Sequence, residues 1–237
     1  MRPLSASQLV SVWERGQAEQ PAERALLLLA VAFPDKEPEE LARLSVGRRD
    51  ACLLTLRESA LGGRLASLVS CIRCGERLEM TLDVAQIRAQ GPDIEATGAL
   101  SLEAGGLEVQ FRLPDTTDLI AMRDASSAEQ ARRILLERCV LSAPADLPDD
   151  AITRISDAME QADPQANVEF AFECPRCGYG WRAIFDIATF FWSELEAAAQ
   201  RLLREVHALA SAYHWREAEI LAMSPVRRQF YLDMVTG

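Results

Sequence analysis

The sequence predicts an α+β fold that is mostly helical, with a small antiparallel β part that a helical insertion splits in two. Three observations predict it: apolar residues at helical spacing near both ends, short stretches that alternate apolar and polar residues, and one Cys-x-x-Cys-Gly turn that occurs twice. We predict three parts: an N-terminal helical region over 1–62, the split β part with a hairpin and the helical insertion over 63–187, and a C-terminal helical region over 188–237.

Residues 5 to 60 have the pattern of helices. The stretch SASQLVSVWERG starts behind a Ser cap, PAERALLLLAVAF opens with Pro at a first-turn position, and VGRRDACLLTLRESALGG ends at a Gly pair. The N-terminal region is therefore expected to be entirely helical.

Alternation begins at Arg64. RLASLVSC leads into the first cysteine turn and ERLEMTLDV follows it, which predicts two half-buried strands. GALSLEAGGLEVQFRLP alternates around Gly105-Gly106, a strong hairpin signal because glycine reaches the positive φ angles of tight primed turns.

Helical patterns return in the insertion and at the C-terminus. DTTDLIAMRD, SSAEQARRILLERCVL and LPDDAITRISDAMEQA are read as helices, after which NVEFAFEC and GWRAIFDI flank the second cysteine turn as strands. From Ala188 onward the chain is expected to be helical throughout, with a final short helix that begins at Ser224-Pro225.

Composition and charge argue against several classes of protein. The longest apolar run, Ala25 to Phe33, is about half as long as a membrane span, and the N-terminus lacks the apolar stretch of a signal peptide. We therefore expect a cytoplasmic protein without a membrane span. The formal net charge of −11 would repel a phosphate backbone, and the arginines form no basic stripe, so we expect no nucleic-acid partner.

Two cysteine pairs have the spacing of a metal site. In a reducing compartment, paired Cys-x-x-Cys turns indicate a metal before a disulfide, and four thiolates from two turns match the tetrahedral sulfur cage of zinc. The glycine after each pair, Gly75 or Gly178, fits the zinc-knuckle turn, where a residue with a Cβ is costly. Strand-like sequence flanks both turns, as in a zinc ribbon. The predicted Zn²⁺ ligands are Cys71, Cys74, Cys174 and Cys177.

The two cysteine turns are related by a constant offset of 103 positions. Asp83 and Ala85 behind the first turn correspond in identity to Asp186 and Ala188 behind the second. The simplest interpretation is a pseudo-two-fold site, in which each hairpin supplies half of the metal cage and half of a small core. The alternative is that the turns are independent and unmetallated, although strands rather than the usual helix of a redox centre follow both.

The predicted zinc is structural. A catalytic zinc keeps one position open for water, whereas four cysteines close the shell, and the two histidines, His207 and His214, both lie in the C-terminal helical stretch. Phosphate-loop, dinucleotide, zinc-protease and nucleophile-elbow motifs are missing from the sequence. We therefore predict that the protein is not an enzyme. The single cysteines Cys52 and Cys139 lie in apolar helical patterns and are interpreted as buried, inert thiols.

The C-terminal run SAYHWREAEILAMSPVRRQFYLDMV carries aromatic and aliphatic residues at helical spacing. Its apolar face either packs on the rest of the chain or docks into a partner assembly, and both interpretations stay open. The candidate partner-binding residues are Tyr213, His214, Trp215, Ile220, Arg227, Arg228 and Tyr231.

Five segments together resemble a known family. They are VGRRDACLLTLRE, CIRCGERLEMTLDV, FRLPDTTDL, CPRCGYGWRAIFDIATFFWSELE and YHWREAEILAMSPVRRQFYLDMV. Over about residues 8–236 the chain resembles the baseplate proteins of contractile phage tails and contractile injection systems, described as similar to the T-even phage baseplate or hub-assembly protein. The resemblance implies a structural or assembly role, with baseplate, hub or other contractile-tail proteins as partners and no catalysis. It implies the same four cysteine ligands.

We therefore predict a non-enzymatic structural or assembly protein, an adaptor or a chaperone, of a contractile tail baseplate. Its four-cysteine zinc site would stabilise it, and it would be cytoplasmic or incorporated into a phage-tail-like particle. The alternative from a different class is a zinc-ribbon regulatory protein that binds nucleic acid or the transcription machinery, against which the negative charge argues. A zinc hydrolase, the third interpretation, would need the open ligand position that four cysteines do not leave.

Overall fold

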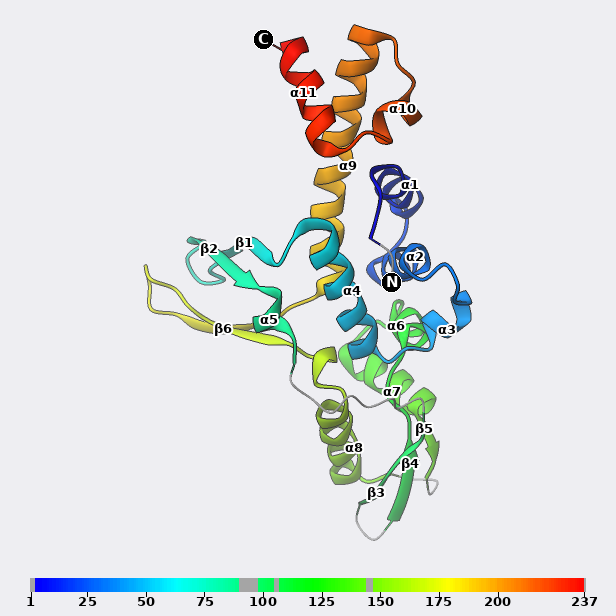
Figure 1. The fold of residues 1–237 in the computed structure, drawn as a ribbon. Coiled ribbons are helices and arrows are strands. Elements are labelled where there is room, and N and C mark those ends of the chain that lie inside the picture. Colours follow the sequence, from blue (N-terminus) through cyan, green and yellow to red (C-terminus); the bar gives the residue numbers. More distant parts are fainter. Residues whose placement is uncertain (1–2, 90–97, 105–106, 144–146, 237) are drawn as a thin grey trace.

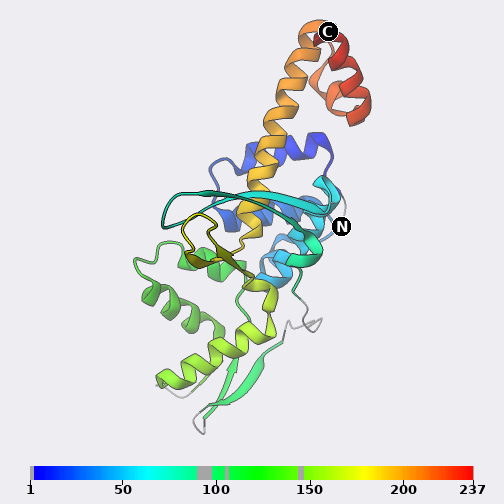
Figure 2. The ribbon, with the colours of Figure 1, turned by 90° about the vertical axis from the view of Figure 1, so that its left-hand side faces the viewer.

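The computed structural model describes residues 3–89, 98–104, 107–143 and 147–236. The predicted α+β class is confirmed, because helices dominate and the strands of these residues form small antiparallel sheets of two or three strands. The molecule is elongated along its longest helix, α9 (Ile187–Tyr213), as Figure 1 shows. The C-terminal helices lie at one end of this axis and the inserted sheet lies at the other, also in the turned view of Figure 2. Within the described residues, no helix is long and apolar enough to cross a membrane.

The N-terminal region is helical, as predicted, and local sequence sets the helix ends. Its helices are α1 (Ala6–Gly16), α2 (Pro21–Ala32), α3 (Pro38–Ala42) and α4 (Val46–Leu61). Ser5 caps α1, because its hydroxyl accepts a hydrogen bond from the Gln8 N–H at 3.2 Å. Pro21 stands in the first turn of α2. At Gly62 the backbone leaves α4 with a φ of 91°, a conformation that glycine adopts readily.

One hydrophobic core extends along α9. The helices α1, α2 and α4 all pack against it. Its fully buried side chains include Phe191, Leu195 and Ala199, and the same core contains Leu28 and Leu53 from the N-terminal helices. Burial of these apolar side chains is the main term that holds the helices together. The core therefore joins the regions 1–62 and 188–237, whose predicted boundaries stay a prediction.

Two β-hairpins project from this helical body, as predicted. The first pairs β1 (Arg64–Ser70) with β2 (Arg77–Asp83), and the second pairs β6 (Glu169–Glu173) with β7 (Gly180–Ile184). They lie next to each other in both ribbon views. The second hairpin feeds directly into α9, where the Asp186 carboxylate accepts the Ala188 N–H at 2.9 Å and so caps the helix.

The insertion between the hairpins forms a small module with its own apolar cluster. Its elements are α5 (Val84–Ile87), β3 (Leu100–Ala104), β4 (Leu107–Phe111), α6 (Thr116–Met122), α7 (Ala128–Cys139), β5 (Val140–Ser142), α8 (Asp149–Ala162) and the 3-10 turn η1 (Pro164–Ala166). β3 and β4 pair antiparallel as predicted, with Ala104 opposite Leu107. The proposed Gly105-Gly106 turn lies outside the described residues. Val109, Phe111 and Ile155 form the buried centre of the module.

One helix of the insertion ends earlier than predicted. The apolar run ILLERCVL is read as helical to its end, but α7 stops at Cys139 and residues 140–142 form β5, which pairs with β4. Val140 and Leu141 are as compatible with a strand as with a helix, so an unpaired edge of β4 can decide the outcome. The helical reading of these last residues was wrong.

The motif FRLPDTTDL forms a buried network around Asp118. This carboxylate is fully buried. It accepts hydrogen bonds from Nη1 and Nη2 of Arg112 at 2.6 and 2.8 Å, and from Arg138 Nε at 2.7 Å. The Asp115 N–H donates to it at 2.9 Å. Burial raises the pKa of the Asp118 carboxyl, but these donors outweigh it and hold the pKa well below its usual range. The network fixes α6 to α7 and to the end of β4.

Buried polar contacts also join distant parts of the chain at α4. Arg57, 2% exposed, donates from Nε and Nη2 to the Glu194 carboxylate on α9 at 2.8 and 2.7 Å. At the other end of α4, the buried Asp163 accepts the Gly47 N–H at 2.8 Å. A Cβ on Gly47 would lie only 1.9 Å from Asp163 Oδ1, so glycine is the residue that this approach allows. These contacts tie α4 both to α9 and to the end of the insertion.

The C-terminal helices fold back on α9. α9 ends where His214 adopts a left-handed φ of 57°, and α10 (Glu217–Leu221) and α11 (Pro225–Thr236) follow. The final helix begins at Pro225, as predicted. Arg228 on α11 donates from Nε to Glu205 on α9 at 2.6 Å, and this pair is largely buried. Ile220 is also fully buried, which fastens α10 to the main core.

Candidate metal centre

Each cysteine pair lies in the tight turn of its own hairpin. In the first turn, the Cys71 N–H donates to the Glu76 carbonyl at 2.8 Å, and the Gly75 N–H donates to the Cys71 carbonyl at 2.9 Å. In the second turn, the Cys174 N–H donates to the Tyr179 carbonyl at 3.0 Å, and the Gly178 N–H donates to the Cys174 carbonyl at 2.9 Å. The two turns are thus built by the same hydrogen bonds, as the sequence offset implied.

The glycine of each turn has the backbone conformation that the sequence pattern predicted. Gly75 has a φ of 74° and Gly178 a φ of 65°, both in the left-handed region where a Cβ is disfavoured. Apart from the glycine itself and its two chain neighbours, no atom of the described residues lies within 4 Å of a Cβ placed on either glycine, so the conformation alone requires glycine.

Gly178→Ala is therefore expected to reduce the free energy of unfolding by about 1 kcal/mol, the cost of a left-handed backbone for a residue with a Cβ. Urea denaturation would measure it. Gly180→Ala is the matched control, because Gly180 lies two residues away without a positive φ and its Cβ would make only an ordinary 3.8 Å contact. Equal losses in the two variants would refute this role of the left-handed turn.

The four sulfur atoms converge although the two pairs are far apart in sequence. Cys71 Sγ lies 3.8 Å from Cys177 Sγ, Cys74 Sγ lies 3.6 Å from Cys174 Sγ, and all four atoms lie within 4.8 Å of one another. A tetrahedral zinc site with Zn–S bonds of about 2.3 Å would place its sulfur atoms about 3.8 Å apart. The cluster therefore fits a four-thiolate zinc site, and it is the one such group of His, Cys, Asp and Glu found among the described residues.

The chemistry of the four thiols also fits a cation. Desolvation raises the pKa of the Cys71 thiol, but the backbone N–H groups of Cys74 and Arg73 donate to its sulfur and bring the pKa to about 7. At Cys74 the Glu76 N–H lowers the pKa, yet desolvation and the hydrogen bonds shared with the other three thiols raise it to about 12. Without a cation, four sulfurs this close cannot all be thiolates. A bound Zn²⁺ would supply the positive charge that lets all four ionise.

Side chains around the turns also connect the two hairpins. Arg176 donates to Glu76 across the cluster at 3.1 Å, an exposed pair that contributes little by itself. Phe172 stacks on Trp181 with ring centroids 5.3 Å apart, which stiffens the second hairpin next to its cysteines. Cys71 and Cys174 are buried, whereas Cys74 is exposed and Cys177 half-buried.

The predicted small core shared by the hairpins is not closed. The strands form two separate two-stranded sheets, and a pocket of about 370 Å³ lies between side chains of the first hairpin, such as Val69 and Met80, and of the second, such as Phe170 and Phe172. The cysteine cluster rather than a packed core is therefore the main connection between the hairpin tips.

The two single cysteines are not part of this cluster. Cys139 is fully buried, as expected, and burial together with the negative charge of Asp118 raises its pKa to about 12. Such a thiol stays protonated and unreactive. Cys52 is only half-buried on α4, and burial raises its pKa as well.

The seven candidate partner-binding residues are not equally accessible. His214 and Arg227 are exposed. Tyr213, Trp215 and Tyr231 are half-buried and pack together: Tyr213 stacks on Trp215 with ring centroids 4.5 Å apart, and Tyr231 meets Trp215 edge-to-face at 4.8 Å. Ile220 and Arg228 are buried against α9 in this conformation. The role of the seven residues in binding stays a prediction.

Residues 14–192 match the model of the family described as T4 bacteriophage base plate protein. The chain belongs to this family. The resemblance seen in the sequence is thereby confirmed over residues 14–192, which contain both hairpins with all four cysteines, whereas the segment YHWREAEILAMSPVRRQFYLDMV lies outside the match. No curated protein and no solved structure matches the chain. Membership of the family supports a structural role in a phage-type baseplate.

Proposed function

We propose that this protein is a non-enzymatic structural or assembly protein of a contractile tail baseplate, and that Cys71, Cys74, Cys174 and Cys177 hold a structural Zn²⁺. The family match over residues 14–192 is the observation that carries the baseplate role. The sulfur geometry and the paired knuckle turns support the zinc. In such a role the metal closes a loop of about 100 residues, which removes conformational freedom from the unfolded chain.

We further propose that α11 presents the docking face for a partner baseplate protein. Val226, Phe230 and Met234 are spaced at i, i+4 and i+8, so they share one side of the helix, and they are 81%, 63% and 52% exposed. Clusters of large, solvent-exposed apolar side chains commonly mark protein interfaces. The buried Arg228–Glu205 pair and the edge-to-face contacts of Tyr231 with Tyr213 and Trp215 hold the helix in position. These contacts would keep the docking face of α11 in a fixed orientation.

Replacing Val226 and Phe230 together by Ser tests this face in the assembling system. Loss of a central apolar anchor typically costs about 2 kcal/mol of binding, so incorporation of the protein into baseplates should fall more than tenfold while its melting temperature stays unchanged. Quantitative mass spectrometry of purified particles and assembly intermediates would measure it. Presence only in intermediates would favour a chaperone over a permanent component.

Leu141→Ser is the matched control, because Leu141 is 53% exposed on β5, at the other end of the molecule. Its incorporation should equal that of the wild type. If the double variant folds and enters baseplates as well as the control, α11 is not the docking face.

A further inference from the structure

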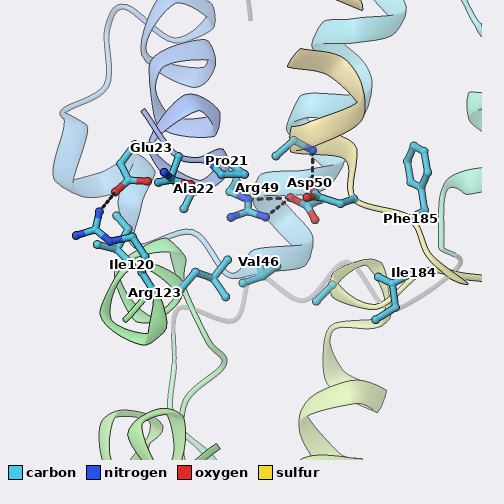
Figure 3. Close-up of a pocket in the computed structure, with 15 residues that line it drawn as sticks. Pro21, Ala22, Glu23, Val46, Arg49, Asp50, Ile120, Arg123, Ile184 and Phe185 are labelled. Atoms are coloured by element: carbon cyan, nitrogen blue, oxygen red, sulfur yellow. Dashed lines mark hydrogen bonds and ion pairs between the residues drawn. The ribbon is translucent and has the colours of Figure 1, made fainter. Parts of the chain in front are cut away.

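A pocket of about 370 Å³ lies where α2, α4, α6 and the start of α9 meet, and none of the four cysteines lines it. Figure 3 shows its residues. Much of its wall is apolar and comes from Pro21, Ala22, Val46, Ile120 and Phe185. Six of the 15 lining residues carry polar or charged side chains, and the two with a polar atom that lacks a partner among the described residues are informative about what the pocket accepts.

The first informative group is Arg49. Its side chain is only 5% exposed, and its Nε and Nη2 both pair with Asp50 Oδ1 at 2.7 Å. The remaining nitrogen, Nη1, is buried and has no hydrogen-bond partner among the described residues. A buried guanidinium N–H without an acceptor is costly, so a group that accepts from Nη1 would be stabilised there.

The second informative group is Glu23, in the first turn of α2. Its Oε1 accepts a hydrogen bond from Arg123 Nη1 at 3.0 Å, whereas its Oε2 is buried and unpartnered within the described part of the chain. Ala22 is drawn between Glu23 and Arg49 in Figure 3, and both side chains line the same pocket. Two residues that line the pocket thus hold one donor and one acceptor without a hydrogen-bond partner among the described residues.

The five charged groups that line the pocket sum to a charge of −1, which argues against an anion, and each of them is already paired or hydrogen-bonded within the chain. Arg49 is paired with Asp50 and Arg123 with Glu23, so these charges cancel. The remaining carboxylate, Asp186, already accepts the N–H groups of Ala188 and Thr189 at the start of α9. A neutral group that both accepts and donates a hydrogen bond fits this arrangement best.

We propose that this pocket binds a neutral amide group of a partner polypeptide. The amide carbonyl accepts a hydrogen bond from Arg49 Nη1, its N–H donates one to Glu23 Oε2, and the adjoining carbon chain lies against the apolar wall. A backbone peptide group and an Asn or Gln side chain share this chemistry. That the polypeptide is another baseplate protein rests on the proposed function, whereas the affinity for an amide does not.

Binding of small amides to the full-length protein tests the proposal by NMR. The probes are N-methylacetamide, which resembles a backbone amide, propionamide, which resembles a Gln side chain, and N,N-dimethylacetamide, which has no N–H. We expect shifts of the Ala22 and Glu23 amide signals and of Arg49 Nε–H, with one N–H-bearing amide binding about tenfold more tightly than N,N-dimethylacetamide. The tighter of the two N–H-bearing amides identifies the backbone or the side-chain source.

The variant Glu23→Gln replaces the proposed acceptor and should bring that affinity ratio to about one. Glu40→Gln is the control, because Glu40 forms a comparable but exposed pair with Lys36 and should leave the ratio unchanged. Acetate tests whether the pocket binds an anion instead of a neutral amide. No shifts at these residues, equal binding of all amides to the wild type, or tighter binding of acetate would overturn the proposal. None of these outcomes bears on docking through α11, so the two proposals fail separately.

Discussion

Removing zinc from the protein is expected to lower its melting temperature by about 10 °C or more. On the chain-entropy model, a cross-link that closes a loop of about 100 residues contributes about 4 to 5 kcal/mol, and for a chain of this size each kcal/mol is about 2 to 4 °C. Coordination itself would add to this, since the folded site would hold the proposed metal and the unfolded chain would not. The melting temperature would be measured by thermal unfolding with and without a chelator. The zinc content would be measured in the same samples.

Cys174→Ser should reproduce the effect of the chelator, because it removes one of the four sulfurs, which is buried at 1% exposure. The purified variant should contain much less than one zinc per chain, whereas the wild type should contain about one. Cys52→Ser is the matched control: Cys52 is a half-buried cysteine outside the cluster, so it should retain its zinc. An unchanged melt in a preparation shown to be free of zinc would contradict a structural metal.

The cysteine cluster could be predicted because short-range sequence encodes its two halves. Cys-x-x-Cys-Gly fixes a turn, alternation on both sides fixes a hairpin, and the constant offset relates the two copies. What the spacing does not encode is how the copies meet. Two of the sulfur contacts run crosswise, from the first cysteine of one turn to the second cysteine of the other, and the hairpins leave a pocket where a small core was expected.

Contacts between distant charged residues were missed for a physical reason. Periodicity identifies which face of a helix is apolar, but it carries no information on a partner more than 100 residues away. Arg57 pairs with Glu194 at a separation of 137 residues, and Asp163 accepts the Gly47 N–H at a separation of 116. The signal that could have found Gly47, Arg49 and Arg57 is that all lie in VGRRDACLLTLRE, a segment that carried the family resemblance.

The packing of the main core could not be predicted either, because it also joins residues that are distant in sequence. The sequence indicates helices in 1–62 and 188–237 separately, because helical spacing is a local property. That α1, α2 and α4 pack on α9 depends on which apolar faces match in shape, and this is decided only in the folded chain. The cysteine cluster and the core thus act together, since both return the chain after the insertion to the parts that precede it.

Asp118→Asn is expected to reduce the free energy of unfolding by about 3 kcal/mol at pH 7, at the lower end of the range for breaking a buried ion pair. The substitution keeps the size of the side chain but removes the charge that Arg112 and Arg138 share. Arg112 is 23% and Arg138 39% exposed, so water compensates part of the loss and the lower value applies. Urea denaturation would measure this loss. Hydrogen exchange of the α8 and β4 amides in the same series would show whether the inserted module unfolds first.

The dependence on pH separates this network from a purely steric effect. The folded-state pKa of Asp118 is depressed, so its contribution is fully present above the pKa of an unfolded carboxyl, about 4, and is lost as the pH falls toward the folded-state value. Between pH 5 and pH 3 the wild type should therefore lose stability more steeply than Asp118→Asn. Asp124→Asn is the control, because Asp124 is 90% exposed and its weak pair with Arg123 spans 3.7 Å, and its curve should follow the wild type. A variant of Asp118 whose curve stays parallel to that of the wild type would show that the carboxylate contributes no charge-dependent stability, and the buried network would then hold β4, α6 and α7 together by packing alone.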